Sequence, residues 1–381
     1  MTALRKTTSH LRALRGGAAP VADDATLDAF WAETTRGDDE AFCADMLPKV
    51  SRTFALSITA LPASLRDTIR VAYLLCRVVD TIEDEAQLSP TERSRLFDAF
   101  DNQMSDDRAD EVAFALQCAR AAIGGESHDA ALCRGAGAVF RVFRDLPAEH
   151  RAAVRPHVLE MSRGMREYTA IADTCGKLRL SNMDELERYC YFVAGTVGKL
   201  LTALFEIEVT DVPAAQLAQI RARAISFGVA LQLVNIVKDV AEDLPRGDCF
   251  LPQSYAHEQG MTLDEILDPE CREAGLNVIA RVCAHARQHL RRAREYTALW
   301  PVDSGSEVRM FCAVPLALAL ATLREVERGA DTLLAGRTPK VSRDVVWAVF
   351  RDAKVAVRRD DTLTWMLSHY ASGGYEVTRD T

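Results

Sequence analysis

The sequence predicts an all-α protein with one large helical domain, and three observations support this prediction. From about Leu27 onward, apolar residues recur at three- and four-residue spacing, which is the period of an amphipathic helix. No run of β-branched and aromatic residues alternates as a strand would. No Pro- or Ser-rich linker divides the chain. We therefore expect a disordered tail over 1–24, one domain over 25–370 and a flexible C-terminus over 371–381.

Clusters of Pro, Gly and Asp predict where the helices end, because Pro and Gly disfavour the helix interior. The expected boundaries are Leu61-Pro62, Leu88-Ser89-Pro90, Gly124-Gly125, Leu146-Pro147, Asp211-Val212-Pro213 and Leu244-Pro245-Arg246-Gly247. Segments 70–80, 189–205 and 227–240 carry few polar residues, and a helix that is apolar on most faces is buried. The polar residues inside these segments need an explanation, because burying an unpaired polar group costs several kcal/mol.

Composition excludes some classes of partner and location. The chain has 381 residues, 48% of them hydrophobic, and a formal net charge of −9. An acidic protein is a poor candidate for binding nucleic acid, because phosphate binding needs a basic surface. The ten cysteines include no C-x-x-C pair, which is typical of reduced cysteines in an intracellular protein. The longest apolar run, 310–323, is shorter than the ~18–20 residues of a bilayer span, so no membrane span is expected.

Two acidic motifs end two of the buried segments. Residues 80–84 (DTIED) and 239–243 (DVAED) share the pattern D-x-x-E-D. A similar copy at 107–111 (DRADE) lies in a polar stretch, and we expect it to be solvated and without function. On a helix, each of the first two motifs continues a narrow polar stripe. The stripes are Tyr73, Arg77, Asp80 and Asp84, and Gln232, Asn235, Asp239 and Asp243.

Such stripes are costly on a buried helix unless a cation neutralises them. Two carboxylates ~4 Å apart repel by a few kcal/mol at an effective dielectric constant of about 20. A divalent cation removes this cost, and oxygen ligands favour Mg²⁺, with Mn²⁺ as the alternative. Two facing aspartate helices could clamp a diphosphate above an apolar cavity, which suits a prenyl diphosphate. The alternative interpretation is two helix ends that carry solvated acids.

Further motifs follow in an order that resembles the squalene/phytoene synthase family, and most closely its squalene-forming branch. The resemblance covers about Leu47 to Leu367. It rests on 51–54 (SRTF), Tyr73, Arg77, 80–84, 161–165 (MSRGM), 189–198 (YCYFVAGTVG), 232–243, 250–252 (FLP), 311–315 (FCAVP) and 321–323 (ATL).

The resemblance implies a single-domain class I isoprenoid synthase bundle with a central cavity. It implies a Mg²⁺-dependent condensation of two farnesyl diphosphates through presqualene diphosphate to squalene, a sterol or hopanoid precursor, with NADPH as reductant. We expect a bacterial-type cytoplasmic monomer without a membrane anchor, which contacts the inner face of the membrane transiently to release product. Two alternatives stay open. One is a synthase of dehydrosqualene, presqualene diphosphate or phytoene, and the other is an inactive member that acts as an assembly or binding factor.

The same resemblance assigns site residues by position. The metal ligands would be Asp80, Glu83, Asp84, Asp239 and Asp243, with Glu242 as an auxiliary carboxylate. Diphosphate would be bound by Ser51, Arg52, Arg77, Gln232, Asn235, Lys238 and Arg246, the last replacing an Arg that the family has at Asp248. The catalytic residues would be Tyr73, Tyr189, Phe54 and Phe311, together with Asp80 and Asp239. Gly195 and Gly198 would allow close helix packing beside the substrate.

Two weaker candidates lie outside these motifs. The basic residues Arg337, Lys340 and Arg343 are candidates for binding the NADPH phosphate, and a solvated loop is the alternative. Cys283, His285 and His289 have passable metal-ligand spacing, but five arginines share their segment. Because cationic neighbours oppose Zn²⁺, we expect this segment to be a solvated helix face.

Overall fold

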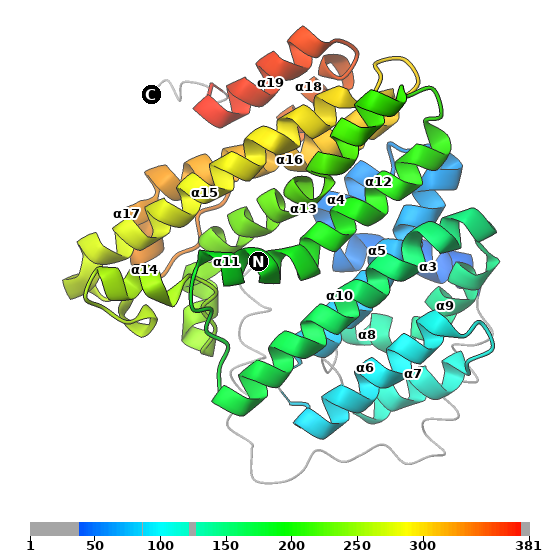
Figure 1. Ribbon diagram of the computed structural model, residues 1–381, viewed down its shortest axis with the longest axis horizontal. Coiled ribbons are helices and arrows are strands. Elements are labelled where there is room, and N and C mark those ends of the chain that lie inside the picture. Colours follow the sequence, from blue (N-terminus) through cyan, green and yellow to red (C-terminus); the bar gives the residue numbers. More distant parts are fainter. Residues whose placement is uncertain (1–37, 86, 122–126, 375–381) are drawn as a thin grey trace.

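The described residues of the chain fold into helices, which confirms the all-α prediction. The computed structural model describes residues 38–85, 87–121 and 127–374 (Figure 1). Within these ranges no strand occurs, and one isolated bridge pairs Arg179 with Cys249. The tail expected over 1–24 lies outside the described residues.

The elements follow one another along the whole described chain. They are α3 (Asp39–Val50), α4 (Arg52–Ile58), α5 (Ala63–Asp84), α6 (Pro90–Ser105), α7 (Glu111–Arg120), α8 (His128–Arg134), α9 (Ala136–Asp145), α10 (Ala148–Cys175), α11 (Met183–Cys190), the π-helix η2 (Tyr191–Gly195), α12 (Thr196–Glu208), α13 (Ala214–Asp243), η3 (Leu244–Arg246), α14 (Gln253–Glu258), η4 (Leu263–Glu265), η5 (Pro269–Cys271), α15 (Arg272–Leu299), α16 (Ser306–Arg328), α17 (Ala330–Leu334), α18 (Arg343–Ala356) and α19 (Asp360–Ser372).

Most of the predicted boundaries are confirmed. Pro62, Pro147 and Pro213 each immediately precede a helix, where the missing N–H of proline costs nothing. Ser89 caps α6, because its hydroxyl accepts from the Glu92 N–H while the Glu92 carboxylate accepts from the Ser89 N–H. The Gly124-Gly125 boundary lies outside the described residues.

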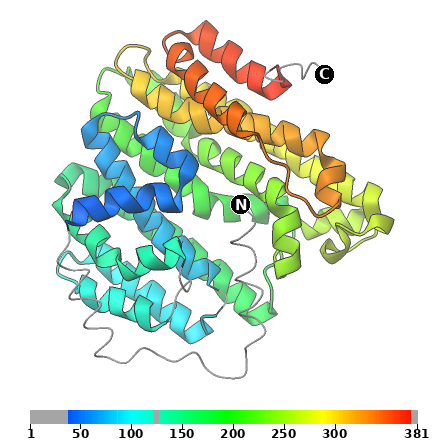
Figure 2. The ribbon, with the colours of Figure 1, turned by 180° about the vertical axis from the view of Figure 1, so that it is seen from behind.

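Two long helices organise the bundle. α5 packs against α3, α8, α9 and α10, while α13 packs against η2, α12, α15 and α16. α10 contacts both α5 and α12, so it joins the two groups of helices. In Figures 1 and 2, α18 and α19 cover α16 at one end of the molecule, and α6 to α9 lie at the opposite end. The two helices that carry the acidic motifs therefore run through the interior of the bundle.

The expectation that no segment is long and apolar enough to span a membrane is wrong. Three helical segments are long and apolar enough: Met183–Glu208, Ala214–Arg246 and Ser306–Arg328. The sequence argument counted only an uninterrupted apolar run, whereas a span tolerates occasional polar residues. In Ser306–Arg328, 89% of the most apolar window is buried inside the bundle, so its hydropathy is accounted for by core packing.

Glycines bring α12 and η2 into close contact with α13. A Cβ atom on Gly198 would lie 2.1 Å from the carbonyl oxygen of Ala224, and one on Gly228 would lie 1.9 Å from that of Ala194. A Cβ on Gly195 would meet only side chains, at 3.0 Å or more. The predicted role of Gly198 in close helix packing is confirmed, and Gly228 completes the contact from the α13 side.

Candidate active site

A mainly apolar cavity of about 270 Å³ lies between α5, α12 and α13. Its apolar wall includes Phe54, Ile58, Ile69, Tyr73, Met161, Val193, Val197, Leu200, Leu201, Phe227, Leu231 and Phe311. Its polar wall is formed by Arg77 and Asp80 from α5 and by Gln232 and Asn235 from α13. Both predicted stripes therefore contribute to one cavity, although they are distant in sequence.

In the first stripe, the guanidinium of Arg77 lies between two carboxylates. Arg77 donates from Nε to Asp129 Oδ1 at 2.8 Å and from Nη1 to Asp80 Oδ2. Burial opposes the charge of Arg77, but the hydrogen bond to Asp129 and the charge of Asp80 raise its pKa overall. Arg77 is part of the polar wall, and its guanidinium is held there by Asp129 of α8 as well as by its own helix.

The second stripe continues past the cavity toward the end of α13. Asp239 is paired with Lys238, with Nζ and Oδ2 2.8 Å apart. Arg246 lies 3.9 Å from Asp243, and its side chain is 65% exposed. The predicted basic residues Lys238 and Arg246 therefore both lie beside predicted metal ligands. The side chain of Arg52 lies outside the described residues.

The carboxylates of the two motifs repel one another. Desolvation and repulsion from Asp80 raise the pKa of Asp84 to about 7, and the charges of Asp248 and Asp243 contribute in the same direction. Desolvation followed by the charge of Asp239 raises the pKa of Asp243 to about 6. The negative charges of Asp84 on α5 and Asp243 on α13 thus act on each other.

This set of donors fits a hard divalent cation. Burial raises the pKa of Asp80 and Glu83, and the charges of neighbouring carboxylates act in the same direction. Buried carboxylates close to one another bind a proton or a cation more readily than an isolated, solvated carboxylate does. Oxygen-only ligands from two helices are the donors that Mg²⁺ prefers.

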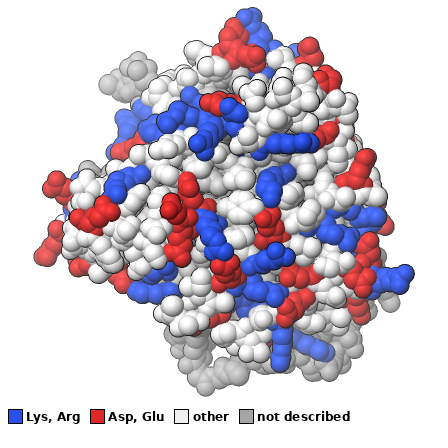
Figure 3. Space-filling model, viewed as in Figure 1, with Lys and Arg blue, Asp and Glu red and all other residues white. Residues whose placement is uncertain are grey.

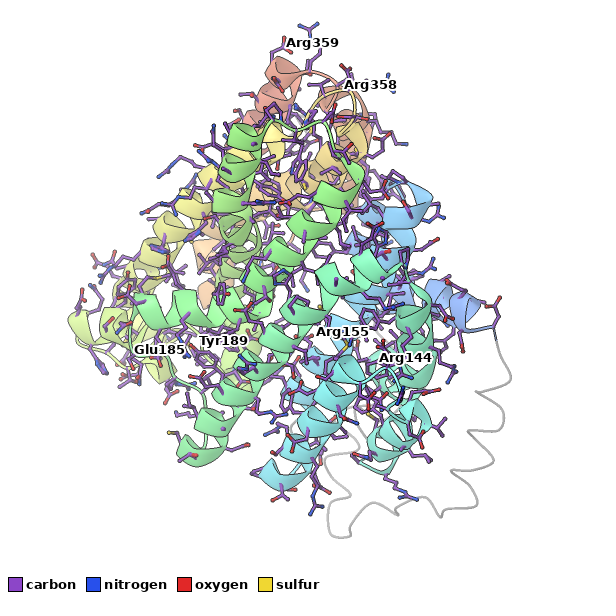
Figure 4. All side chains as sticks on the ribbon, turned by 45° about the vertical axis from the view of Figure 1, so that its right-hand side comes forward. Arg144, Arg155, Glu185, Tyr189, Arg358 and Arg359 are labelled. Atoms are coloured by element: carbon purple, nitrogen blue, oxygen red, sulfur yellow. The ribbon has the colours of Figure 1, made fainter. Side chains whose placement is uncertain are left out.

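Tyr189 lies beside the first acidic motif. Its ring stacks on Phe250 with centroids 5.0 Å apart and meets Tyr168 edge-on at 5.1 Å. Burial and the charges of the Glu83 and Asp84 carboxylates raise its pKa well above the usual value, so the phenol is neutral. Figure 4 shows its position on α11, near Glu185.

The segment proposed for cofactor binding approaches the second motif. Thr338 donates to Glu242 Oε1 at 2.7 Å, and Lys340 Nζ lies 3.2 Å from the same oxygen. Arg337 and Arg343 are exposed. Glu242 therefore ties the loop before α18 to α13, which places basic residues beside the acidic motif rather than at a remote loop.

The interpretation of Cys283, His285 and His289 as a solvated helix face is wrong. Cys283 is 2% exposed and His289 is 9% exposed, because this side of α15 packs against α11 and α13. Burial lowers the pKa of His289, so its imidazole is neutral at pH 7. Arg287 and Arg291 are exposed, whereas Arg281 and Arg292 lie one turn from His285 and His289 on the same side of the helix. The third copy of the acidic pattern does lie at the surface, where Asp107 pairs with Arg155.

Sequence reasoning missed several residues of the site. Asp129 stands in a short helix without any motif, and only the fold brings it to Arg77. Phe250 was recognised as part of a motif, but its stacking on Tyr189 was not. Gly228 could have been found, because it lies within an apolar helix where Gly lowers stability unless backbones must approach.

Comparison with known proteins identifies the group to which these features belong. The family model described as Squalene/phytoene synthase matches residues 47–345. The squalene synthase of Schizosaccharomyces pombe is 27% identical over 76% of this chain and 60% of its own length. That of Eremothecium gossypii is 29% identical over 77% of this chain and 63% of its own length. The chain thus spans less than two thirds of these relatives.

Solved structures show the same fold. A complex of TcSQS with the ligand E5700 has a TM-score of 0.75 at 23% identity, covering 90% of this chain and 94% of that one. A dehydrosqualene synthase in complex with a ligand has a TM-score of 0.55 at 19% identity, covering 85% of this chain and 98% of that one. The helical architecture is therefore shared with both.

Proposed function

Because the chain belongs to the squalene/phytoene synthase family, we propose that it condenses two farnesyl diphosphates head to head and reduces the product to squalene. The observation that carries this proposal is one cavity whose apolar wall meets both acidic stripes. The apolar wall suits the hydrocarbon chains, and the polar wall suits the diphosphates. The intact aspartates of both stripes argue against an inactive family member.

The polar wall would bind and activate the diphosphates. Mg²⁺ held by Asp80, Asp84, Asp239 and Asp243, with Glu83 close by, would neutralise charge on the departing diphosphate. Arg77 has a fork of donors suited to phosphate oxygens, and Asp129 holds that fork in place. Gln232 and Asn235 add neutral hydrogen-bonding groups to the same wall. The C–O bond of one substrate would break here to leave an allylic cation.

The aromatic wall would protect and direct that cation. Phe54 and Tyr73 lie 5.8 Å apart between ring centroids, and both line the cavity with Phe311. Ring faces attract positive charge, and an apolar wall keeps water from quenching it. The double bond of the second substrate would attack the cation and lose a proton to give presqualene diphosphate. The neutral hydroxyl of Tyr189 is suited to donate a hydrogen bond to a diphosphate oxygen.

Presqualene diphosphate would then lose its diphosphate, rearrange and be reduced to squalene. NADPH would supply the hydride for this step. Arg337, Lys340 and Arg343 are accessible basic residues that fit a phosphate group, and the contact of Lys340 with Glu242 holds this segment beside α13.

A membrane would receive the apolar product. Trp347 on α18 and Trp365 on α19 are each 62% exposed, and the two helices pack together. Tryptophan favours the membrane–water interface. Figure 4 shows the turn between these helices, at Arg358 and Arg359, far from Tyr189. On the face in Figure 3, acidic and basic side chains are interspersed, so electrostatic attraction alone would not hold this face on a membrane.

Product analysis tests the reaction. The protein is incubated with Mg²⁺ and either farnesyl diphosphate or its C20 homologue, with and without NADPH, and the products are identified by mass spectrometry. Squalene formed from the C15 substrate only when NADPH is present is the expected result. Products that do not change with NADPH would reject the reductive step, and turnover of the C20 substrate alone would indicate a phytoene-type synthase. No consumption of either substrate would indicate an inactive member.

A further inference from the structure

A second cluster of metal-ligating side chains lies outside the cavity, between α11 and α15. Glu187 Oε1 lies 2.9 Å from His289 Nε2 and also contacts His285 Nε2. One ligand atom from each of the three residues lies within 4.8 Å of the others. His285 and His289 are four residues apart on one helix, so their rings share a face. The three side chains thus converge on one point.

We propose that Glu187, His285 and His289 bind a divalent transition metal of the zinc class, separately from the aspartates of the cavity. Two histidines and one glutamate are a known protein ligand set for zinc, with a fourth position left to water. Nitrogen ligands distinguish this site from the oxygen-only cavity site, which favours Mg²⁺. The proposal does not depend on the proposed reaction.

The geometry needs only a small adjustment to accept the ion. Zinc bonds of about 2.0–2.1 Å place tetrahedral ligands about 3.3 Å apart. The Glu187 oxygen is slightly too close to both imidazoles, so a small withdrawal of this half-exposed carboxylate opens the space. The metal would bind His289 at Nε2, which now faces Glu187, while the buried Nδ1 atom of His289 has no partner among the described residues in either case.

Part of the nearby positive charge is compensated by other ion pairs. Arg281 pairs with Glu258 at 2.5 Å, and Arg287 pairs with Glu327. These pairs reduce the repulsion that the two arginines would exert on a bound cation, while the charge of Arg292 still acts on His289. The site is accessible from the side of Glu187 and His285, whose side chains are 38% and 24% exposed. A metal ion can therefore enter from solvent without opening the core.

A metal here would fasten α11 to α15. Glu187 is two residues before Tyr189 on α11, and both histidines are on α15. The ion would fix the helix that carries Tyr189 without touching the cavity. We therefore expect its first effect to be on stability.

Metal titration of the full chain tests the site. Protein freed of metal with a chelator is titrated with Zn²⁺ by calorimetry in excess Mg²⁺, which occupies the oxygen site. We expect one Zn²⁺ per chain, and at least a tenfold weaker Kd in Glu187→Gln, His285→Gln and His289→Gln. Co²⁺ in place of Zn²⁺ should give the intense visible absorption of a four-coordinate site with nitrogen ligands.

Control variants separate this site from the rest of the molecule. His257→Gln changes an exposed histidine and should keep the wild-type Kd. Asp80→Asn and Asp239→Asn should also keep it, because they alter only the cavity. If His289→Gln fails to fold, the partly exposed His285 still provides the test. Two outcomes would overturn the proposal. One is a wild-type chain that binds no Zn²⁺ when Mg²⁺ is in excess. The other is a Kd for Zn²⁺ in all three ligand variants that equals the wild-type Kd.

Discussion

Arg77 on α5 is held by Asp129 on α8, with Nε and Oδ1 2.8 Å apart. The same guanidinium also bonds Asp80, so one cation lies between a predicted metal ligand and a residue that no motif indicates. This arrangement divides the donors of Arg77 between the two carboxylates. It leaves the fork of Arg77 at the polar wall of the cavity, where a diphosphate would bind.

Removing Asp129 should therefore impair turnover without removing any group that touches substrate. We expect Asp129→Ala to lower consumption of farnesyl diphosphate by roughly 10- to 150-fold, because a hydrogen bond to a charged group contributes about 1.5–3 kcal/mol. Asp129→Asn keeps an oxygen acceptor for Nε and should recover most of the activity. Steady-state kinetics measures both variants, and equal losses in the two would contradict the positioning role.

The predicted metal ligands can be tested against a copy of the same pattern at the surface. Asp80→Asn and Asp239→Asn should each reduce farnesyl diphosphate consumption by about 100-fold or more, because each removes a carboxylate that would hold Mg²⁺. Asp107→Asn alters an exposed acid of the third copy and should leave turnover unchanged. A chelator such as EDTA should also stop the wild-type reaction. Normal turnover in Asp80→Asn, or in excess EDTA, would refute the metal assignment.

Stability without metal should depend on pH through Asp84. Its pKa is about 7 in the folded chain and 3.8 in the reference state, so the folded protein holds this proton more tightly. Stability from this group is therefore present below pH 4 and is lost as pH rises to 7. In EDTA, Asp84→Asn should have a higher melting temperature than wild type, by an amount that grows from pH 4 and levels off above pH 7.

Differential scanning fluorimetry across this pH range measures the difference between the two proteins. Adding Mg²⁺ supplies the missing positive charge, so it should stabilise wild type more at pH 8 than at pH 5. A difference between variant and wild type that does not change with pH would show that Asp84 has an ordinary pKa.

The close contact of α13 with η2 and α12 predicts a graded series of glycine variants. Gly198→Ala and Gly228→Ala would drive Cβ into the carbonyl groups of Ala224 and Ala194, and should cost about 1–3 kcal/mol or more. Gly195→Ala meets only side chains, which can move, and should cost less. Chemical denaturation measures the three free energies of unfolding. Equal losses at all three positions would mean that the backbones do not constrain this contact.

Particular residues show how far the sequence alone could lead. The stripe formed by Asp80 and Asp84 was visible because the helix period and the apolar surroundings are both local properties of the chain. Helix starts at Pro62 and Pro213 were predictable for the same reason, since proline restricts its own backbone. The membrane argument overlooked 214–246 because it counted only uninterrupted apolar runs, and hydropathy alone cannot tell whether such a helix faces lipid or other helices.

The sequence by itself determined the all-α class, the two acidic stripes, most helix boundaries and the likeness to a prenyl-transfer family, because each depends on residues close together in the chain. Only the tertiary structure decided that Asp129 holds Arg77, that Phe250 stacks on Tyr189 and that Glu187 meets His285 and His289. These contacts join helices through packing angles that no local pattern encodes. Their partners are ordinary residues in ordinary helices until the fold brings them within bonding distance.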